Sequence, residues 1–193
     1  MRNAKLEKCI KDIKKLNCFY KEYNKKFNKR YPFYRPSEQE VVAYQILPLL
    51  FSLGLSKEQI AVQYPTNYSN AKNHADIIVY EEKFNEGLRG NEAKDSVKEI
   101  NSKILTIIEA KNPSILDSNK EHDKEYESKR LYKEAKKYLQ DDMLCKSIIV
   151  TDGLRYYAYD PKNDKQIAKI DPKRDKLEYG EICTFFREVG LKP

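Results

Sequence analysis

The sequence predicts an α/β fold in which a mixed β-sheet is flanked by helices, and three observations lead to it. Apolar residues recur at helical spacing in two N-terminal segments, residues 4–29 and 37–53. Short apolar runs rich in β-branched residues, which are typical of strands, follow further along the chain. The order of segments is helix, then helix–strand–strand–strand–helix–strand, then strand–strand–helix. Such alternation is typical of a sheet covered by helices.

The N-terminal segment is predicted to be a long basic helix. Its apolar positions follow the helical period, with lysines at many of the positions between them: Leu6, Ile10, Ile13, Leu16, Tyr20, Tyr23 and Phe27. A helix with such an apolar stripe docks it on other apolar surface. Pro32 and Pro36 end the helix, because proline restricts its own backbone and that of the preceding residue. We therefore expect a helical extension over residues 1–35 and the main domain over residues 36–193.

The main domain is predicted to open with a helix and to continue with six strands. Ser37 and Glu40 fit the capping box that begins a helix, and Gly54 fits its end. Residues 81–103 are polar and are expected to form an exposed hairpin extension, and residues 112–120 are expected to form a loop. Strands are predicted at residues 60–64, 75–80, 104–110, 147–151, 155–160 and 166–170, helices at 121–140 and 177–188, and a tight turn at Asp152-Gly153.

Composition excludes several classes of protein. The chain of 193 residues suits one domain, and only 40% of its residues are hydrophobic. The longest apolar stretch, residues 41–55, is interrupted by Gln45, Pro48 and Ser52, so we expect no membrane span. We also expect no secretory signal, because the N-terminus lacks an apolar core segment. The four cysteines form no Cys-x-x-Cys pair, which disfavours structural zinc and indicates reduced thiols in a cytoplasmic protein.

The positive charge is concentrated at the N-terminus. The whole chain has a formal net charge of +7, and residues 1–35 hold 12 basic and 3 acidic side chains, so the rest is slightly acidic. This asymmetry favours contact with nucleic acid or another acidic surface, although a solvated helix face would look the same. The basic helix either adds non-specific DNA affinity or completes the hydrophobic core.

Two predicted strands carry charged residues where apolar ones are expected. Asp76 lies in the strand at 75–80, and Glu109 and Lys111 lie at the end of the strand at 104–110. Because alternate strand residues point to the same side, Glu109 and Lys111 share a face. Buried charges are costly unless they pair with each other or bind an ion. If the two strands are neighbours, Asp76 and Glu109 can bind one Mg²⁺, which prefers hard oxygen ligands. A structural ion pair is the alternative.

Asp76 followed by Glu109-Ala110-Lys111 resembles the signature of the PD-(D/E)XK nucleases. The surrounding residues resemble the N-terminal nuclease domain of type I restriction-enzyme R subunits. The similar segments are Ser37-Glu38 with the helix after it, Ile107-Ile108-Glu109-Ala110-Lys111, Glu134-Ala135-Lys136-Lys137-Tyr138 in place of a Gln-Ala-x-x-Tyr motif, and Ile149-Val150-Thr151-Asp152-Gly153 in place of a Thr-Asn-Gly turn. Three positions differ from the family, with Ala75 in place of proline, Glu134 in place of glutamine and Asp152 in place of asparagine.

The resemblance implies a restriction-endonuclease-like core and a DNA endonuclease that uses Mg²⁺, with Mn²⁺ as a substitute. It implies that Asp76, Glu109 and the Ala110 carbonyl hold the metal ion. Lys111 would position or deprotonate the attacking water, and Glu38 would orient a water or a second ion. Further candidates are Glu40, Glu134 and Tyr138. For Glu40 helix capping is the stronger interpretation, and for Tyr138 core packing is an equally good one.

The implied partners are DNA and the motor, methyltransferase and specificity components of a restriction system. An alternative is a nuclease-fold module for DNA binding or assembly that lacks activity. The change at Glu134 favours this alternative, and the complete set of Asp76, Glu109 and Lys111 disfavours it. Nuclease action on RNA or on single-stranded ends is a third possibility, which the sequence does not separate from the first.

Overall fold

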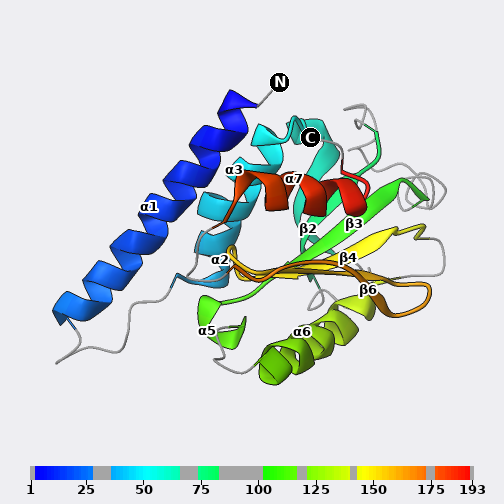
Figure 1. Ribbon diagram of the computed structural model, residues 1–193. Helices are drawn as coiled ribbons and strands as arrows, with labels where there is room; N and C mark the ends of the chain where they lie inside the picture. Colours follow the sequence, from blue (N-terminus) through cyan, green and yellow to red (C-terminus); the bar gives the residue numbers. More distant parts are fainter. Residues whose placement is uncertain are drawn as a thin grey trace.

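The fold is built on one six-stranded sheet whose strands lie side by side in sequence order (Figure 1). A computed structural model describes residues 3–27, 36–65, 74–82, 102–116, 121–139, 143–172 and 177–191. The strands are β1 (Ile60–Pro65), β2 (His74–Tyr80), β3 (Ile104–Ala110), β4 (Ser147–Thr151), β5 (Tyr156–Asp160) and β6 (Lys165–Ile170). All six predicted strands are confirmed, with ends that agree to within one residue.

The sheet is mixed, as the sequence predicts. β3 and β4 are parallel, whereas the other neighbouring strands pair antiparallel. Parallel neighbours need a long crossover, and the chain between β3 and β4 supplies it with α5 (Pro113–Leu116) and α6 (Glu121–Lys136). The turn at Asp152-Gly153 joins β4 to β5. Its Gly153 has φ 86°, in the left-handed region that glycine adopts without a steric penalty.

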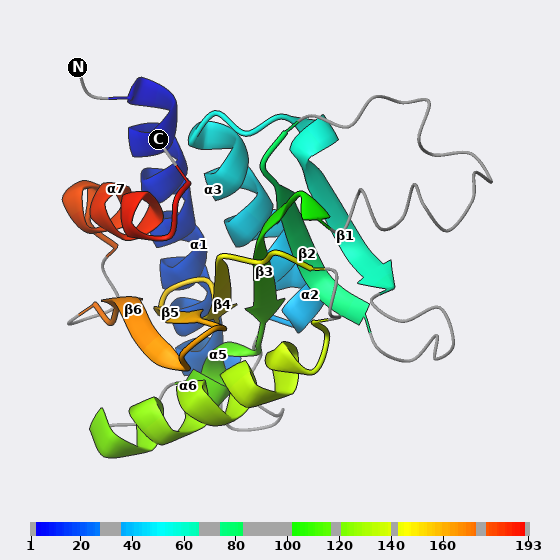
Figure 2. The ribbon, with the colours of Figure 1, turned by 90° about the vertical axis from the view of Figure 1, so that its right-hand side faces the viewer.

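Helices cover both faces of the sheet (Figures 1 and 2). Those on one face are α1 (Ala4–Phe27), the segment formed by α2 (Glu38–Val41), η1 (Val42–Ile46) and α3 (Leu47–Ser52), and α7 (Tyr179–Glu188); a short turn, η2 (Lys57–Gln59), precedes β1. The other face packs on α5 and α6. Ile108 of β3 belongs to the first core cluster and Ile107 to the second, as the strand period requires. β3 is therefore buried on both sides up to Glu109, and its one polar residue before that point, Thr106, donates a hydrogen bond to Ser147 O on β4.

The helical segment after Ser37 begins and ends as predicted but is not one regular helix. Glu40 N donates to Ser37 Oγ at 3.2 Å and Ser37 N donates to Glu40 Oε2 at 2.8 Å, which completes the capping box. Gly54 follows its end with φ 96°. In between, Val42–Ile46 is π-helical, which the apolar spacing does not predict.

The first half of α1 is part of the hydrophobic core. Leu6, Ile10 and Ile13 are buried in the same cluster as residues of α3 and α7. Asn3 caps the helix by accepting from Leu6 N, and its side-chain amide donates to Ser52 O at 2.9 Å. The apolar stripe therefore docks on the core and leaves lysines exposed: Lys5, Lys8, Lys11 and Lys15.

One predicted loop contains a helix. Residues 113–116, expected within the loop at 112–120, form α5, a single turn that is too short to show a periodic pattern in the sequence. The expected hairpin at 81–103 and the expected break at 31–36 lie mostly outside the described residues. The boundary between 1–35 and 36–193 therefore stays a prediction. In the described part of the chain, no helix is long and apolar enough to cross a membrane.

Candidate active site

The ends of β2 and β3 separate at the two predicted carboxylates. The antiparallel ladder pairs Ile77 with Ile108 and goes no further toward this end. Asp76 and Glu109 are the next residues on the two strands, so their backbones lie beyond the ladder. The side chain of Asp76 spans the opening, because its Oδ2 accepts a hydrogen bond from Ala110 N at 2.8 Å. The separation of the strands thus makes room for a polar site at the end of a buried sheet.

A second donor holds the other oxygen of Asp76. Gln63 Nε2, on the edge strand β1, donates to Asp76 Oδ1 at 2.9 Å. The sequence does not single out Gln63, since a polar residue on an edge strand is ordinary. The pairing register of β1 and β2 identifies Gln63, because Val62 pairs with Ile77 and Tyr64 with Ala75, which leaves Gln63 facing Asp76.

Glu109, Lys111 and Glu38 form the other half of the site. Lys111 Nζ donates to Glu109 Oε1 at 2.6 Å and lies 3.7 Å from Glu38 Oε2. Glu38 is the first residue of α2, and the capping box at Ser37 fixes where that helix begins. The structure therefore brings together the four residues that the sequence predicts as catalytic, from β2, the end of β3 and the start of α2.

Burial gives Glu109 an unusual electrostatic position. Its side chain is only 6% exposed, and its Oε2 atom is buried with no hydrogen-bond partner among the described residues. Burial, with the nearby charge of Asp76, raises the pKa of Glu109 to about 7, although Lys111 opposes the rise. Burial lowers the pKa of Lys111, but the carboxylates of Glu109, Glu38 and Asp76 raise it by more. Three carboxylates thus surround one ammonium group, which leaves an excess of negative charge.

The remaining candidates differ in their distance from this cluster. Tyr138 follows the end of α6 and is half-buried; burial, then the charge of Glu109, and a weak, long hydrogen-bond interaction with that carboxylate raise its pKa to about 12. Tyr138 also packs against the core on the α6 side, so both interpretations apply to it. Glu40 completes the capping box. Glu134 pairs with Arg130 on the exposed side of α6, and the structure does not bring it to the carboxylates.

Comparison with protein families supplies an independent result. The family described as type I restriction enzyme R protein N terminus (HSDR_N) matches residues 39–172. The chain belongs to this family. Its role therefore lies in a restriction system, as the resemblance implies. The match to the R-protein N terminus covers all six strands and three of the four site residues, Asp76, Glu109 and Lys111, and begins one residue after Glu38. Neither a curated protein nor a solved structure matches the chain significantly.

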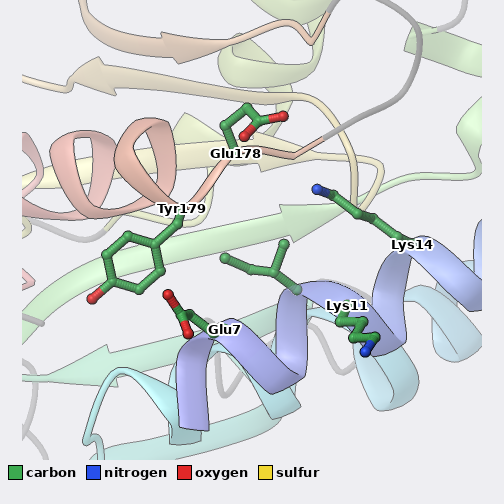
Figure 3. Close-up of a pocket in the computed structure, with 6 residues that line it drawn as sticks. Glu7, Lys11, Lys14, Glu178 and Tyr179 are labelled. Carbon is green, nitrogen blue, oxygen red and sulfur yellow. The ribbon is translucent and has the colours of Figure 1, made fainter. Parts of the chain in front are cut away.

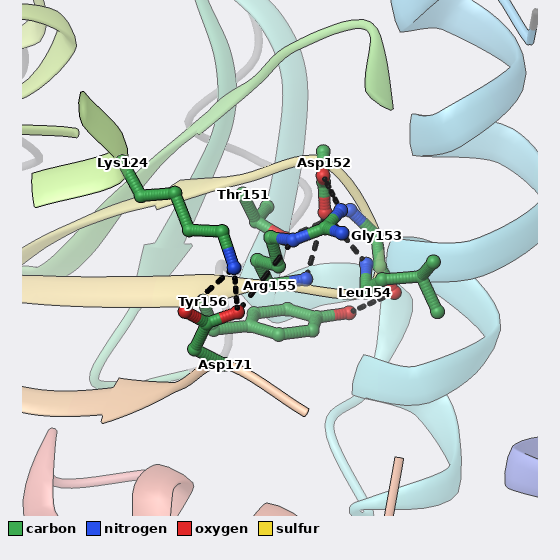
Figure 4. Close-up of polar contacts among 8 residues, drawn as sticks. All are labelled: Lys124, Thr151, Asp152, Gly153, Leu154, Arg155, Tyr156 and Asp171. Atoms are coloured by element: carbon green, nitrogen blue, oxygen red, sulfur yellow. Dashed lines mark hydrogen bonds and ion pairs between the residues drawn. The ribbon is translucent and has the colours of Figure 1, made fainter. Parts of the chain in front are cut away.

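In this R-protein N-terminal domain, a largely buried charge network stabilises the turn between β4 and β5 (Figure 4). Asp152 Oδ1 accepts from the backbone N–H groups of Leu154 and Arg155, and its Oδ2 accepts from Arg155 Nη1 at 2.8 Å. Asp171 continues the network, 3.6 Å from Arg155 Nε and 3.1 Å from Lys124 Nζ. The sequence predicts the turn but not this network, since Lys124 and Asp171 are far from the turn in the chain.

The same turn positions the end of β3. The carbonyl of Thr151, next to Asp152, accepts a hydrogen bond from Lys111 N at 2.8 Å. Thr151 also pairs with Ala110 in the parallel ladder. The backbone on which Lys111 is mounted is therefore fixed by the residue that precedes the buried turn.

A separate hollow lies between α1 and the start of α7 (Figure 3). Its volume is about 210 Å³, and side chains of both charges line it: Glu7, Ile10, Lys11, Lys14, Glu178 and Tyr179. In Figure 3 the Glu7 carboxylate points toward Tyr179, whereas Lys11 points away from it. None of these residues belongs to the carboxylate cluster, and their charged ends do not converge.

The donor atoms decide which metal the site could hold. The described residues contain no group of three or more His, Cys, Asp or Glu side chains arranged to hold a metal ion. The site offers two carboxylates, Asp76 and Glu109, and the neighbouring carbonyl of Ala110. These are hard oxygen donors, which suit Mg²⁺ or Mn²⁺ with water completing the shell. The unpartnered Glu109 Oε2 is the atom that fits such an ion best.

Proposed function

We propose that this domain is a Mg²⁺-dependent DNA endonuclease that hydrolyses phosphodiester bonds within a restriction system. The observation that carries the proposal is the meeting of Glu38, Asp76, Glu109 and Lys111 at the point where β2 and β3 separate. Carboxylates placed close together oppose folding, most of all where one of them is buried as Glu109 is, and such groups gather at functional sites. An ion pair formed for stability alone would leave no reason for a buried, unpartnered oxygen on Glu109.

Each residue has a separate task in this proposal. Asp76, Glu109 and the Ala110 carbonyl would hold the ion. When bound, Mg²⁺ supplies a Lewis acid that polarises the scissile phosphate and activates a water. Lys111 places a positive charge where negative charge develops on the phosphate, and it positions the attacking water. Glu38 holds Lys111 from the helix side and orients a water.

The exposed lysines of α1 would add affinity for DNA. Lys5, Lys8, Lys11 and Lys15 are exposed on the outer surface of a helix whose other side is in the core. Lysine contacts with phosphates strengthen binding without sequence preference and make it dependent on salt. The proposed substrate is therefore held by charge on α1 and cut at the carboxylate site.

A cleavage assay with one matched pair of variants tests the proposal. Lys111→Ala should retain its fold, measured by circular dichroism and thermal melting, and should lose about 10²–10³-fold in Mg²⁺-dependent cleavage of duplex DNA. Lys146→Ala is the control, because Lys146 also sits at a strand end and pairs with Glu81, but on the exposed surface. It should cut DNA at the rate of the parent.

Parallel reactions with single-stranded DNA and with RNA determine the substrate class. Equal cleavage by Lys111→Ala and the parent would overturn the assignment of Lys111. A parent that binds duplex DNA in a salt-dependent manner but cuts no substrate with either Mg²⁺ or Mn²⁺ would overturn the nuclease proposal. That result would favour the inactive binding or assembly module.

A further inference from the structure

We infer that Gln63 is a positioning residue that fixes the orientation of the Asp76 carboxylate for metal binding. Gln63 lies on β1, outside the four predicted catalytic residues, and its side-chain amide donates to Asp76 Oδ1 at 2.9 Å. This inference rests on the proposed function, because it assigns Gln63 to the ion that Asp76 would hold. It adds a third strand to a site otherwise built from β2, β3 and α2.

The backbone at Gln63 is the first reason for this assignment. Gln63 has φ 52°, in the left-handed region that residues with a β-carbon rarely adopt. The β1–β2 register passes from Val62–Ile77 to Tyr64–Ala75, and the Gln63–Asp76 position between them is not a paired one. Such conformations persist where the surrounding structure imposes them, and they gather at functional sites. A residue needed only to bend the strand would be glycine, which adopts this conformation without a steric penalty.

The chemistry of the two donors on Asp76 is the second reason. Gln63 Nε2 holds Oδ1 and Ala110 N holds Oδ2, so both oxygens are fixed by neutral N–H groups. A carboxylate held in this way cannot rotate freely, and neither of its two partners brings a neutralising positive charge. Each carboxylate oxygen has two lone pairs, so one hydrogen bond leaves it able to bind an ion. Glu109 differs, since its partner is the ammonium group of Lys111.

Two substitutions distinguish the contribution of the Gln63 side-chain amide from that of its backbone conformation. Gln63→Met keeps the length of the side chain and the strained backbone but removes the donor. Gln63→Gly removes the donor and also relieves the strain. Gln166→Gly is the matched control, because Gln166 is an exposed glutamine on β6, the opposite edge strand. The readouts are thermal melting without metal and the affinity for Mn²⁺, measured by calorimetry on the whole chain.

We expect both Gln63 variants to bind Mn²⁺ about 10-fold or more weakly than the parent, since loss of a group that orients a metal ligand costs about that much. Gln63→Gly should melt no lower than Gln63→Met, whereas Gln166→Gly should keep the parent's affinity. If Gln63→Gly binds Mn²⁺ as tightly as the parent, the role of Gln63 lies in its backbone and the inference is wrong. If the parent itself binds no Mn²⁺, the proposed metal site fails, and the inference fails with it.

Discussion

Two buried carboxylates in this protein are held in opposite ways. Asp152 has no exposed surface, and both of its oxygens accept hydrogen bonds, two from backbone N–H groups and one from the Arg155 guanidinium. Glu109 is nearly as buried, but only its Oε1 is firmly bonded, and its Oε2 has no hydrogen-bond partner within 3.5 Å among the described residues. Burial raises the pKa of both groups.

The difference indicates which acid serves the fold and which serves a ligand. A buried carboxylate that is fully hydrogen-bonded and paired with a cation has satisfied its own charge. One that is left incompletely bonded opposes folding until something else binds to it. By this criterion Asp152 is structural, and Glu109 is the group that the proposed ion would bind. Substitutions at Arg155 and at Glu109 test this distinction, and changes at exposed lysines serve as a comparison on the surface.

The largest loss of stability is expected when the ion pair between Asp152 and Arg155 is broken. Arg155→Met removes the cation from beside Asp152, and loss of one partner of a buried ion pair costs about 3–5 kcal/mol. The pKa of Asp152, already raised by burial, would rise further without Arg155. The variant should therefore lose more stability as the pH rises through that pKa. Urea unfolding at several pH values measures this loss.

The double variant Asp152→Asn/Arg155→Met serves as the control for the broken pair. With both charges removed from the turn, it should recover much of the lost stability and lose the extra pH dependence. A single Arg155→Met variant as stable as the parent would show that Asp152 does not depend on this pair.

A gain in stability is expected where the incompletely bonded acid is neutralised. Glu109→Gln removes a carboxyl group whose pKa is raised from 4.5 to about 7. The ionised group opposes folding, so the gain should be absent at low pH, grow between pH 4.5 and about 7, and stay constant above that. Its upper limit is about 3 kcal/mol. Metal-dependent cleavage should fall to background in the same variant.

Thermal melting without metal tests whether Glu109→Gln is more stable than the parent, and Glu134→Gln is the exposed control. The control should change stability by less than about 0.5 kcal/mol. A Glu109→Gln variant that is less stable than the parent at pH 8 would place Glu109 with Asp152 among the structural acids.

The smallest effect on stability is expected at exposed charges. Changing the four lysines Lys5, Lys8, Lys11 and Lys15 to glutamine should alter stability by less than about 0.5 kcal/mol per site. DNA titrations at several salt concentrations should instead show a reduced salt slope, by at most about 0.9 per lysine. Lys162→Gln with Lys165→Gln is the control. An unchanged slope would remove α1 from the DNA contact. Deleting α1 cannot serve this purpose, because Leu6, Ile10 and Ile13 are part of the core.

The sequence predicts the sheet well and its irregularities poorly. The strands follow from runs of apolar residues, and the ends of the second helix follow from Ser37, Glu40 and Gly54, whose side chains or flexibility act locally. The π-helical turn at Val42–Ile46 is not predictable in this way, since a shift of one residue in hydrogen bonding leaves the apolar spacing nearly unchanged. α5 escapes prediction because four residues cannot show a period.

Some residues of the candidate site can likewise be predicted from the sequence, and others cannot. Glu109 and Lys111 share a face by strand alternation, and Asp76 joins them once β2 and β3 are neighbours, so the sequence contains the information for this group. Gln63 becomes recognisable only through the register of β1 and β2, and Arg155 only through the geometry of the turn that brings it back to Asp152, three residues earlier. Glu134 shows the converse, because its accessory role follows only from its place in a motif, and on α6 its side chain pairs with Arg130 and is exposed.

The hydrogen bond from Ala110 to Asp76 has a spectroscopic consequence. Most amides in a sheet are bonded to the neighbouring backbone, and their signals report on the fold. The Ala110 amide is bonded to a carboxylate that can also bind other groups. Its proton chemical shift and its rate of exchange with deuterium therefore depend on where that carboxylate is held. The domain thus contains an intrinsic reporter, one backbone N–H whose resonance would shift if an ion bound to Asp76.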